Sequence, residues 1–279
     1  MKNVLVLIKG AGDLASGVAH RLYKCGFTPV MTELHKPLVV RRKVSFAEAV
    51  YTGETIVEGI RAVLCSSISD ISSLLEKGII PVFIDPRGEL VHILKPDVLV
   101  DAVMAKRNTG TKITDAHVVI ALGPGFIAGV DAYAVIETKR GHELGRVILD
   151  GTPQKDTGEP HPVEGYTYQR LIKAPQEGIF GSCCSIGEIV ENGQIIGYIE
   201  GNQVQTQIKG VLRGLVADGC IVKKGMKIGD VDPRCKPEYC CTISDKARAV
   251  AGGVLEAMLD RVLDRVLSKK VPGGAGFVN

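Results

Sequence analysis

The chain has 279 residues, of which 45% are hydrophobic and 23% charged, and its formal net charge is +3. This length allows two compact domains, each with its own core. The small net charge argues against binding to nucleic acid or to a membrane surface. No window holds the roughly 18 apolar residues of a membrane-spanning helix. The first apolar run is too short for a signal peptide, so we expect a cytoplasmic protein.

Eight cysteines are present, and because we expect no secretion signal, most of them should be free thiols. Cys25 and Cys65 lie in apolar surroundings and are expected in the core. Two groups stand out in the last third of the chain: Cys183 and Cys184, then Cys235, Cys240 and Cys241. Their spacing matches no recognised zinc pattern, so we predict no metal site and expect packing or surface thiols.

Short apolar runs alternate with helical patterns through residues 1–150. Residues 4–8 form a continuous apolar run, typical of a parallel strand buried on both faces. A helical stripe follows over residues 13–24. Further strands are predicted at residues 28–32, 61–65, 79–85, 96–100 and 117–122, with a helix over 69–77. This rhythm predicts an α/β fold with a Rossmann-like, doubly wound, mostly parallel sheet that binds a nucleotide or cofactor.

A connector or surface loop, rich in glycine and proline, is predicted over residues 151–173. An internal repeat lies within residues 174–234, where six positions recur 32 residues later. The first copy has Gly187, Val190, Gly193, Ile196, Gly197 and Ile199, and the second has Gly219, Val222, Gly225, Ile228, Gly229 and Val231. Each copy reads as a strand, a tight glycine turn and another strand. Two interlocked copies predict a small barrel-sandwich β module resembling biotinyl and lipoyl carrier domains.

A carrier domain would need a lysine at the hairpin between the two copies. The stretch "IEGNQVQTQ" contains none, and Lys209 comes too late. We therefore expect this module to pack, position or recognise something. Residues 235–270 predict a C-terminal helical segment with Ser244 as its N-cap, and residues 271–279 a flexible tail. The apolar face of this helix comprises Val250, Val254, Leu255, Met258, Leu259, Val262, Leu263 and Val266.

The stretch "GAGDLASG" has the spacing of a dinucleotide-binding turn between a predicted strand and a predicted helix. Gly10 permits the turn, Gly12 would let backbone amides approach a phosphate, and Ala15 allows close packing. Glu33 ends the next strand, where its carboxylate would accept a ribose hydroxyl. Asp13 either places negative charge where a phosphate would sit or caps the helix. The turn thus predicts either a nucleotide-like ligand or close packing alone.

A second glycine turn, "GPGFIAG", repeats this spacing with Gly123, Gly125 and Ala128. The next apolar run begins too soon for a crossover helix, so this is not a second Rossmann unit. Successive amides, with Pro124 stiffening the loop and Phe126 following it, would form an anion-binding nest. The alternative is a tight turn between strands.

Three charged clusters follow predicted strands, namely Arg41 and Arg42, then Lys106, Arg107 and Asn108, then Glu137, Arg140 and His142. Side chains just past the strands of an open α/β sheet converge on its ligand crevice. Arginines suit phosphate because a guanidinium binds two oxygens at once. Glu137, Arg140 and His142 are the catalytic candidates, with His142 transferring protons. The alternative for His142 is an ordinary surface residue.

Eight motifs, in one order from about residue 2 to about residue 265, resemble the YqeB family. They are "IKGAGDLASGVAHRL", "RRKVSFAEAVYTGE", "VDAVMAKRNTGT", "ALGPGFIAG", "VIETKRGHELGRVI", "GVLRGLVADG", "KIGDVDPR" and "TISDKARAVAGGVLEAM". The resemblance implies an accessory role in maturing or assembling selenium-dependent molybdenum hydroxylases, and kinship with XdhC-like proteins. It implies an anionic cofactor, either a molybdopterin-type cofactor or a dinucleotide. It also implies a molybdenum hydroxylase subunit or other maturation proteins as partners, with the extra thiols available for selenium or sulfur chemistry.

Two other functions stay open at this point. One is an NAD-type oxidoreductase or a transferase acting on the cofactor. The other is a non-catalytic docking scaffold whose glycine turns only pack. The sequence also leaves the oligomeric state open, a homo-oligomer included.

Overall fold

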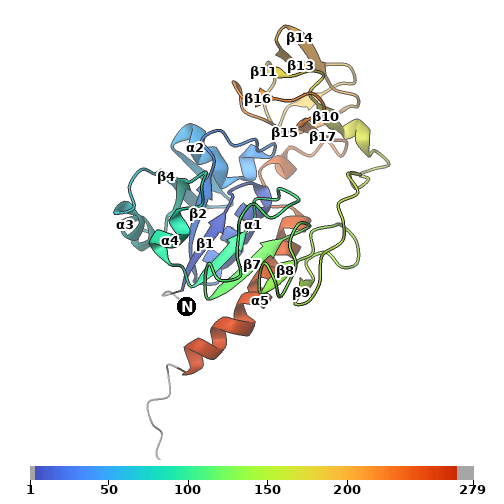
Figure 1. Cartoon of the computed structure of the whole chain (residues 1–279). Helices are drawn as coiled ribbons and strands as arrows, with labels where there is room; N and C mark the ends of the chain where they lie inside the picture. Colours follow the sequence, from blue (N-terminus) through green and yellow to red (C-terminus); the bar gives the residue numbers. More distant parts are fainter. Residues whose placement is uncertain (1–3, 269–279) are drawn as a thin grey trace, which may run out of the picture.

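The computed structural model describes residues 4–268, with side chains described up to residue 261. The chain forms an α/β body around a large sheet and a smaller β module beyond one end of it (Figure 1). The chain leaves the body for the module and then returns, so that the last helix packs on the body. The predicted tail over residues 271–279 lies outside the described residues.

Across residues 4–268, the body holds a nine-stranded sheet with the order β3-β4-β5-β2-β1-β6-β7-β8-β9. Its strands are β1 (Leu5–Lys9), β2 (Thr28–Glu33), β3 (Glu54–Val57), β4 (Ile60–Cys65), β5 (Ile80–Ile84), β6 (Val98–Asp101), β7 (Val118–Leu122), β8 (Ala134–Ile136) and β9 (Val147–Ile148). The strands from β4 to β8 are parallel, whereas β3 and β9 pair antiparallel at the two edges.

This sheet shows that the predicted Rossmann-like, doubly wound fold is wrong. In the Rossmann order the third parallel strand lies beside the second, but here β5 separates β4 from β2. No helix of the described chain connects β6 to β7 or β7 to β8. The apolar runs indicated which segments are buried strands but not which neighbour each strand takes. The edge strands β3 and β9 are exposed or half-buried at every position except Val57 and gave no such signal.

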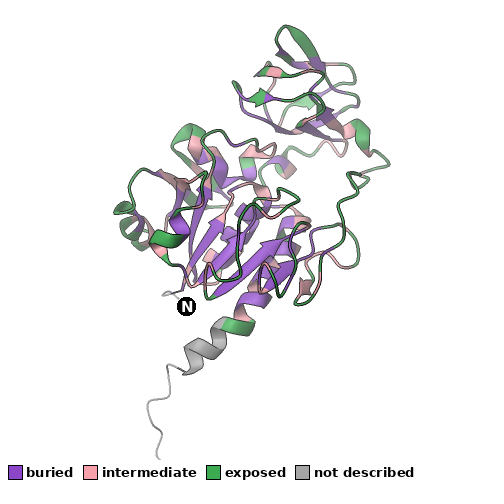
Figure 2. Ribbon diagram, viewed as in Figure 1, coloured by how far each residue is buried: buried purple, intermediate pink, exposed green. Residues whose placement is uncertain are grey.

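The helices pack on both faces of this sheet. They are α1 (Asp13–Lys24), α2 (Ala49–Thr52), α3 (Asp70–Glu76), α4 (Leu90–Leu94) and α5 (Asp245–Ser268), with 3₁₀ turns η1 (Arg42–Val44), η2 (Phe46–Glu48), η3 (Tyr168–Arg170) and η4 (Pro237–Cys240). Successive side chains of β1 point to opposite faces of the sheet, so the core has two parts. Val6 and Ile8 pack in the cluster with α1 and α5, whereas Leu7 packs in the cluster with α3 and α4. The strands between these two layers are buried (Figure 2).

Helix α5 lies against α1, although more than 200 residues separate them in the chain. A Cβ built on Gly17 would lie 2.8 Å from Cβ of Ala247, so the two backbones approach closely at small residues. The Ser244 hydroxyl accepts the Ala247 N–H at 3.2 Å, which confirms the predicted N-cap. Of the predicted apolar face, Val250, Val254 and Met258 are buried and Leu255 and Leu259 half-buried. The side chains of Val262, Leu263 and Val266 lie outside the described residues.

The β module consists of two four-stranded antiparallel sheets in the part of the chain described, with the orders β10-β17-β15-β12 and β14-β13-β11-β16. Its strands are β10 (Leu171–Lys173), β11 (Gly178–Ser182), β12 (Ile189–Val190), β13 (Ile195–Ile199), β14 (Asn202–Gln205), β15 (Gly210–Leu215), β16 (Ile221–Val222) and β17 (Lys227–Asp232). The short and long strands of each repeat copy lie in different sheets, so the copies interlock. Gly193 and Gly225 make the equivalent turns, with φ of +79° and +80°.

The fold-class prediction of a barrel-sandwich module is corrected to this pair of sheets. The repeat specified β12, β13, β16 and β17, whereas β10, β11, β14 and β15 lie outside the repeat and complete the sheets. The module begins at β10, within the residues expected to be a connector, because this strand pairs with β17.

Candidate functional site

The first glycine turn joins β1 to α1 at the carboxyl end of the parallel strands. Gly10 has φ of +89°, and a Cβ built on it would lie 3.0 Å from the Ala102 carbonyl oxygen. Ala15 is buried in the core on the α1 side of the sheet. The predicted roles of Gly10 in the turn and Ala15 in packing are therefore confirmed.

Glu33 holds this turn from the end of β2. Its Oε1 accepts the Ala11 N–H at 3.1 Å and its Oε2 accepts the Leu34 N–H at 2.6 Å. Burial raises the pKa of Glu33, and these two hydrogen bonds lower it by a smaller amount. Each carboxylate oxygen of Glu33 thus receives one backbone N–H, and its predicted role as a ribose acceptor stays a prediction.

The N-terminus of α1 stays uncapped by any described side chain, with Gly12 at the N-cap position. The amides of Asp13, Leu14 and Ala15 have no acceptor one turn earlier in the helix. Asp13 does not cap the helix, and its Oδ2 lies 3.6 Å from Nη1 of Arg41. A Cβ built on Gly12 would meet no described atom closer than 3.8 Å. A side chain at position 12 would therefore not clash with the described residues.

Lys246 lies beside the α1 N-terminus, at the start of α5. We call Lys246, Asp13, Glu137, Arg140 and Asp156 the sheet-edge cluster, since all four others act electrostatically on the Lys246 ammonium. Burial lowers the pKa of Lys246, Arg140 lowers it further, and the three carboxylates raise it. Its Nζ forms no hydrogen bond or ion pair with any described residue. An ammonium in this state can accept an anionic partner.

The three predicted catalytic residues do not form one constellation. Both carboxylate oxygens of Glu137 accept backbone N–H groups at 2.7 Å, one of them from Gln154. Arg140 makes a bidentate pair with Asp245 at 2.6 and 2.7 Å. His142 is exposed and lines a shallow cavity of about 420 Å³ in its own loop. The proton-transfer prediction is thus corrected, because the other two side chains are engaged elsewhere.

The second glycine turn is filled by the protein itself. Gly123 and Gly125 have φ of +71° and +109°, and a Cβ on Gly125 would lie 2.5 Å from the Arg107 backbone. Phe126 is buried in the core and Pro124 is half-buried. The anion-nest prediction is therefore corrected in favour of a tight packing turn.

The loop after β6 packs on this turn but directs its side chains differently. Lys106 pairs with Asp156. The Asn108 side chain donates to the Thr111 carbonyl at 2.8 Å and shapes the loop rather than binding a cofactor. Arg107 is exposed and forms no ion pair with the described residues. The three residues therefore do not converge on one ligand position.

Arg41 and Arg42 also point in different directions, which corrects their predicted use as a phosphate-binding pair. Arg42 donates to the Leu215 carbonyl at 3.0 Å and to Glu48 at 2.8 Å. It lines a cavity of about 730 Å³ between the body and the β module, with Lys43 and Cys184 among its other walls. Arg42 thus fastens the module to the body.

Arg41 belongs to a second charged group, which we call the seam cluster: Arg41, Arg213, Arg234, Asp232 and Tyr239. Arg41 donates to the Tyr239 carbonyl at 2.9 Å, and the Arg234 guanidinium lies 4.5 Å from the Tyr239 ring centroid. Arg234 donates to Asp232 at 2.8 Å, and Arg213 lies 3.5 Å from the same carboxylate. These residues form a chain of contacts across the junction of body and module.

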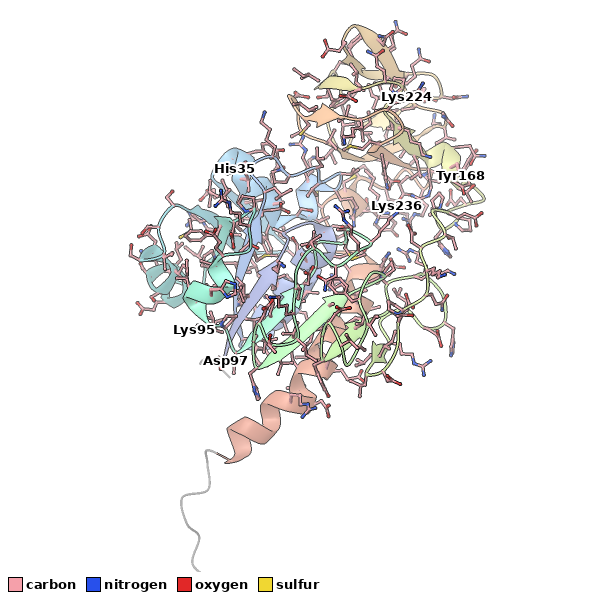
Figure 3. The ribbon with its side chains drawn as sticks, in the orientation of Figure 1. His35, Lys95, Asp97, Tyr168, Lys224 and Lys236 are labelled. Atoms are coloured by element: carbon pink, nitrogen blue, oxygen red, sulfur yellow. The ribbon has the colours of Figure 1, made fainter. Side chains whose placement is uncertain are left out.

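Lys236, labelled in Figure 3, marks the place of the seam cluster between the module and the body. Its Nζ lies 5.3 Å from the ring centroid of Tyr239. The cluster therefore has cationic side chains along its rim as well as in its interior.

Three polar residues meet at the ends of β1 and β6, which are neighbours at the centre of the sheet. Lys9 donates to the Thr111 hydroxyl at 2.6 Å and lies 3.4 Å from Asp101. The Thr111 hydroxyl donates to Asp101 at 2.5 Å. Sequence reasoning did not bring these three residues together, although Lys9 and Asp101 each directly follow a predicted strand. It also singled out none of Arg213, Asp232, Arg234 and Lys246 as site residues, although each lies within a motif of the YqeB resemblance.

Within residues 4–261, no three histidine, cysteine, aspartate or glutamate side chains are placed to hold a metal ion. The eight cysteines are free thiols, with Cys65 buried and Cys25 packed on the core. None of the helices described has the length and apolar character to cross a membrane.

A protein of Escherichia coli (strain K12), described as uncharacterized protein YqeB, is 49% identical to the chain over 255 residues. The chain is a homologue of YqeB. The match covers 91% of this chain and 47% of YqeB, so the chain spans about half the length of YqeB. The predicted resemblance to the YqeB family is confirmed over this span. No protein-family model matches the YqeB homologue.

Solved structures similar to the YqeB homologue include a succinylglutamate desuccinylase/aspartoacylase from Rhodobacter sphaeroides and an aspartoacylase family protein from Mesorhizobium loti. Both are 14% identical and cover 82% of this chain and 84% of their own, with TM-scores of 0.25 and 0.27. Such low scores support no conclusion about fold or activity. None of these proteins is described as a molybdenum-cofactor biosynthesis protein, so the comparisons give that description of the chain no support.

Proposed function

We propose that the chain binds a small anionic ligand, of the nucleotide or molybdopterin type, over the N-terminus of α1. The observation that carries this proposal is the Lys246 ammonium, which forms no hydrogen bond or ion pair with a described residue and lies beside an uncapped helix N-terminus. Helix N-termini favour phosphate, because their free N–H groups and the helix dipole both point at it. A neighbouring ammonium strengthens that preference.

The Asp13 carboxylate would repel an anion at this helix N-terminus, but its charge is paired. Arg41 lies 3.6 Å from the Asp13 carboxylate and offsets its charge. Gly12 keeps the approach to the amides open, whereas Gly10 and Glu33 fix the turn below them. The ligand site then consists of the amides of residues 12–15, with Lys246 at its side.

Gly12→Val tests this proposal. Gly12 has φ of −65°, which any residue adopts, so we expect the variant to fold while its side chain blocks the phosphate. ADP and NAD, added in turn, should raise the thermal midpoint of the wild-type chain and leave that of the variant unchanged. Gly181→Val is the matched control, because a Cβ on Gly181 meets no described atom within 4 Å and one on Gly12 meets none closer than 3.8 Å. An equal shift in wild type and Gly12→Val would refute the site.

The accessory role in maturation of selenium-dependent molybdenum hydroxylases, and the kinship with XdhC-like proteins, stay predictions of the sequence resemblance. Co-purification from the native host tests the first, by asking whether a molybdenum hydroxylase subunit accompanies the chain. The matching measurement is the selenium content of that enzyme after deletion of the protein. Unchanged selenium and no co-purified hydroxylase would contradict this role.

A further inference from the structure

Two segments run side by side where the module meets the body. The Val40 carbonyl accepts the Leu215 N–H at 2.8 Å, and the Arg42 side chain donates to the Leu215 carbonyl at 3.0 Å. Arg41 belongs to the first of these segments and Arg213 to the second. The body and the module thus each bring one arginine of the seam cluster to the same place.

Both arginines are largely buried, and each has one N–H donor without an acceptor, although Arg41 also donates to the Tyr239 and Thr242 carbonyls. Arg41 is 10% exposed and Arg213 12%. The Nε of each is buried and has no hydrogen-bond partner among the residues described. A buried N–H without an acceptor is unfavourable, and guanidinium groups almost always have theirs filled.

Positive charge exceeds negative charge around Arg213, which favours a bound anion. Asp232 is 1% exposed and already receives two hydrogen bonds from the Arg234 side chain at 2.8 and 2.5 Å. Arg213 lies 3.5 Å from the same carboxylate. Burial lowers the pKa of Arg213, and the nearby charge of Arg41 lowers it further. Two guanidinium groups, those of Arg213 and Arg234, therefore share the buried Asp232, and the like charge of Arg41 acts on Arg213.

We propose that the seam cluster binds a phosphate- or sulfate-class oxyanion, held between Arg41 and Arg213. Two guanidinium groups in a buried site present several N–H donors to the oxygens of one tetrahedral anion. The anion supplies the missing acceptors and offsets the like charges. Since one arginine comes from the body and the other from the module, the bound anion also fastens the two together. This site goes beyond the proposed function, because its donors are side chains of the seam and not amides of α1.

The experiment compares thermal unfolding of the full chain in sodium phosphate and in sodium chloride at equal ionic strength. We expect phosphate to raise the midpoint by about 3 °C at ten times its dissociation constant. Arg213→Gln and Arg41→Gln should lose this shift. Arg146→Gln is the matched control, since Arg146 is an exposed arginine paired with Glu143. No phosphate-specific shift in wild type, or an undiminished shift in Arg213→Gln, would overturn the inference.

Stability without phosphate separates a ligand site from a structural role. Arg213→Gln removes one of two facing like charges, so in chloride we expect its midpoint to equal or exceed that of wild type. A residue that only supports the fold would lower the midpoint in both salts. A large loss in chloride, or a failure of the variant to fold, would therefore contradict the proposed site.

A second arm with ADP identifies the source of the phosphate. Stabilisation by ADP alone that depends on Arg213 supports the site and shows that its phosphate belongs to a larger ligand. Stabilisation by ADP that depends on Gly12 but not on Arg213 supports the proposed function and overturns this inference. A phosphate shift that Arg213→Gln abolishes and Gly12→Val leaves intact supports the seam site independently of the α1 site.

Discussion

Glu33 shows how one carboxylate can organise a turn that resembles a cofactor site. It hydrogen-bonds the backbone of Ala11 from the neighbouring strand, so part of the turn's donor capacity is used within the protein. Asp13 is likewise paired, with Arg41. The spacing of the glycines predicted the turn and its helix correctly. It did not predict these partners, because a hydrogen bond to a backbone amide leaves no pattern in the sequence.

The pH dependence of stability reports on Glu33. Burial raises the pKa of Glu33 in the folded chain above its ordinary value of 4.5. The folded state therefore holds this proton more tightly than the unfolded state, so the contribution of Glu33 is complete below pH 4.5 and is lost as the pH rises through the folded pKa. We expect the free energy of unfolding of wild type, relative to Glu33→Gln, to fall over this range. Urea titrations between pH 3.5 and 7 measure it, and a flat or rising difference would contradict it.

At the scale of helices and strands, the sequence predicted the features that depend only on residues close together in the chain. The N-cap at Ser244 and the buried positions of α5 follow from spacing within one helix, and the structure confirms them. The order of strands in the sheet does not follow from spacing, because every parallel strand carries a similar apolar run. The packing of α5 on α1 is equally hidden, since it depends on Gly17 and Ala247 meeting across the chain.

Two glycine-to-alanine changes test that helix contact. In Gly17→Ala the new Cβ would lie 2.8 Å from Cβ of Ala247, so we expect overpacking to destabilise the chain by about 1–3 kcal/mol. In Gly252→Ala the new Cβ meets no described atom within 4 Å, and the higher helix propensity of alanine should stabilise by about 1 kcal/mol. Chemical unfolding measures both. Equal effects of the same sign would mean that the α1–α5 contact is looser than described.

At the scale of the whole molecule, the charged residues that matter most are far apart in the sequence. Arg41 lies in the body, Arg213 and Asp232 in the module, and Lys246 in the helix that returns to the body. The approach of Arg41 to Arg213 depends on how the module docks, which no local pattern encodes. The catalytic candidates failed for the same reason, because Arg140 finds its partner Asp245 over 100 residues later.

Asp232→Asn tests whether the seam holds the body and the module together. The substitution removes the buried carboxylate that Arg213 and Arg234 share, so uncompensated positive charge would remain in a buried place. Breaking such a buried network costs about 3–5 kcal/mol, which urea unfolding would show. Limited proteolysis should then cut residues 149–167 faster, because that segment spans the two parts. Glu191→Gln, which breaks the exposed pair with Lys209, should cost less than about 1 kcal/mol. Equal costs for the two variants would mean that the seam charges contribute no more than surface pairs do.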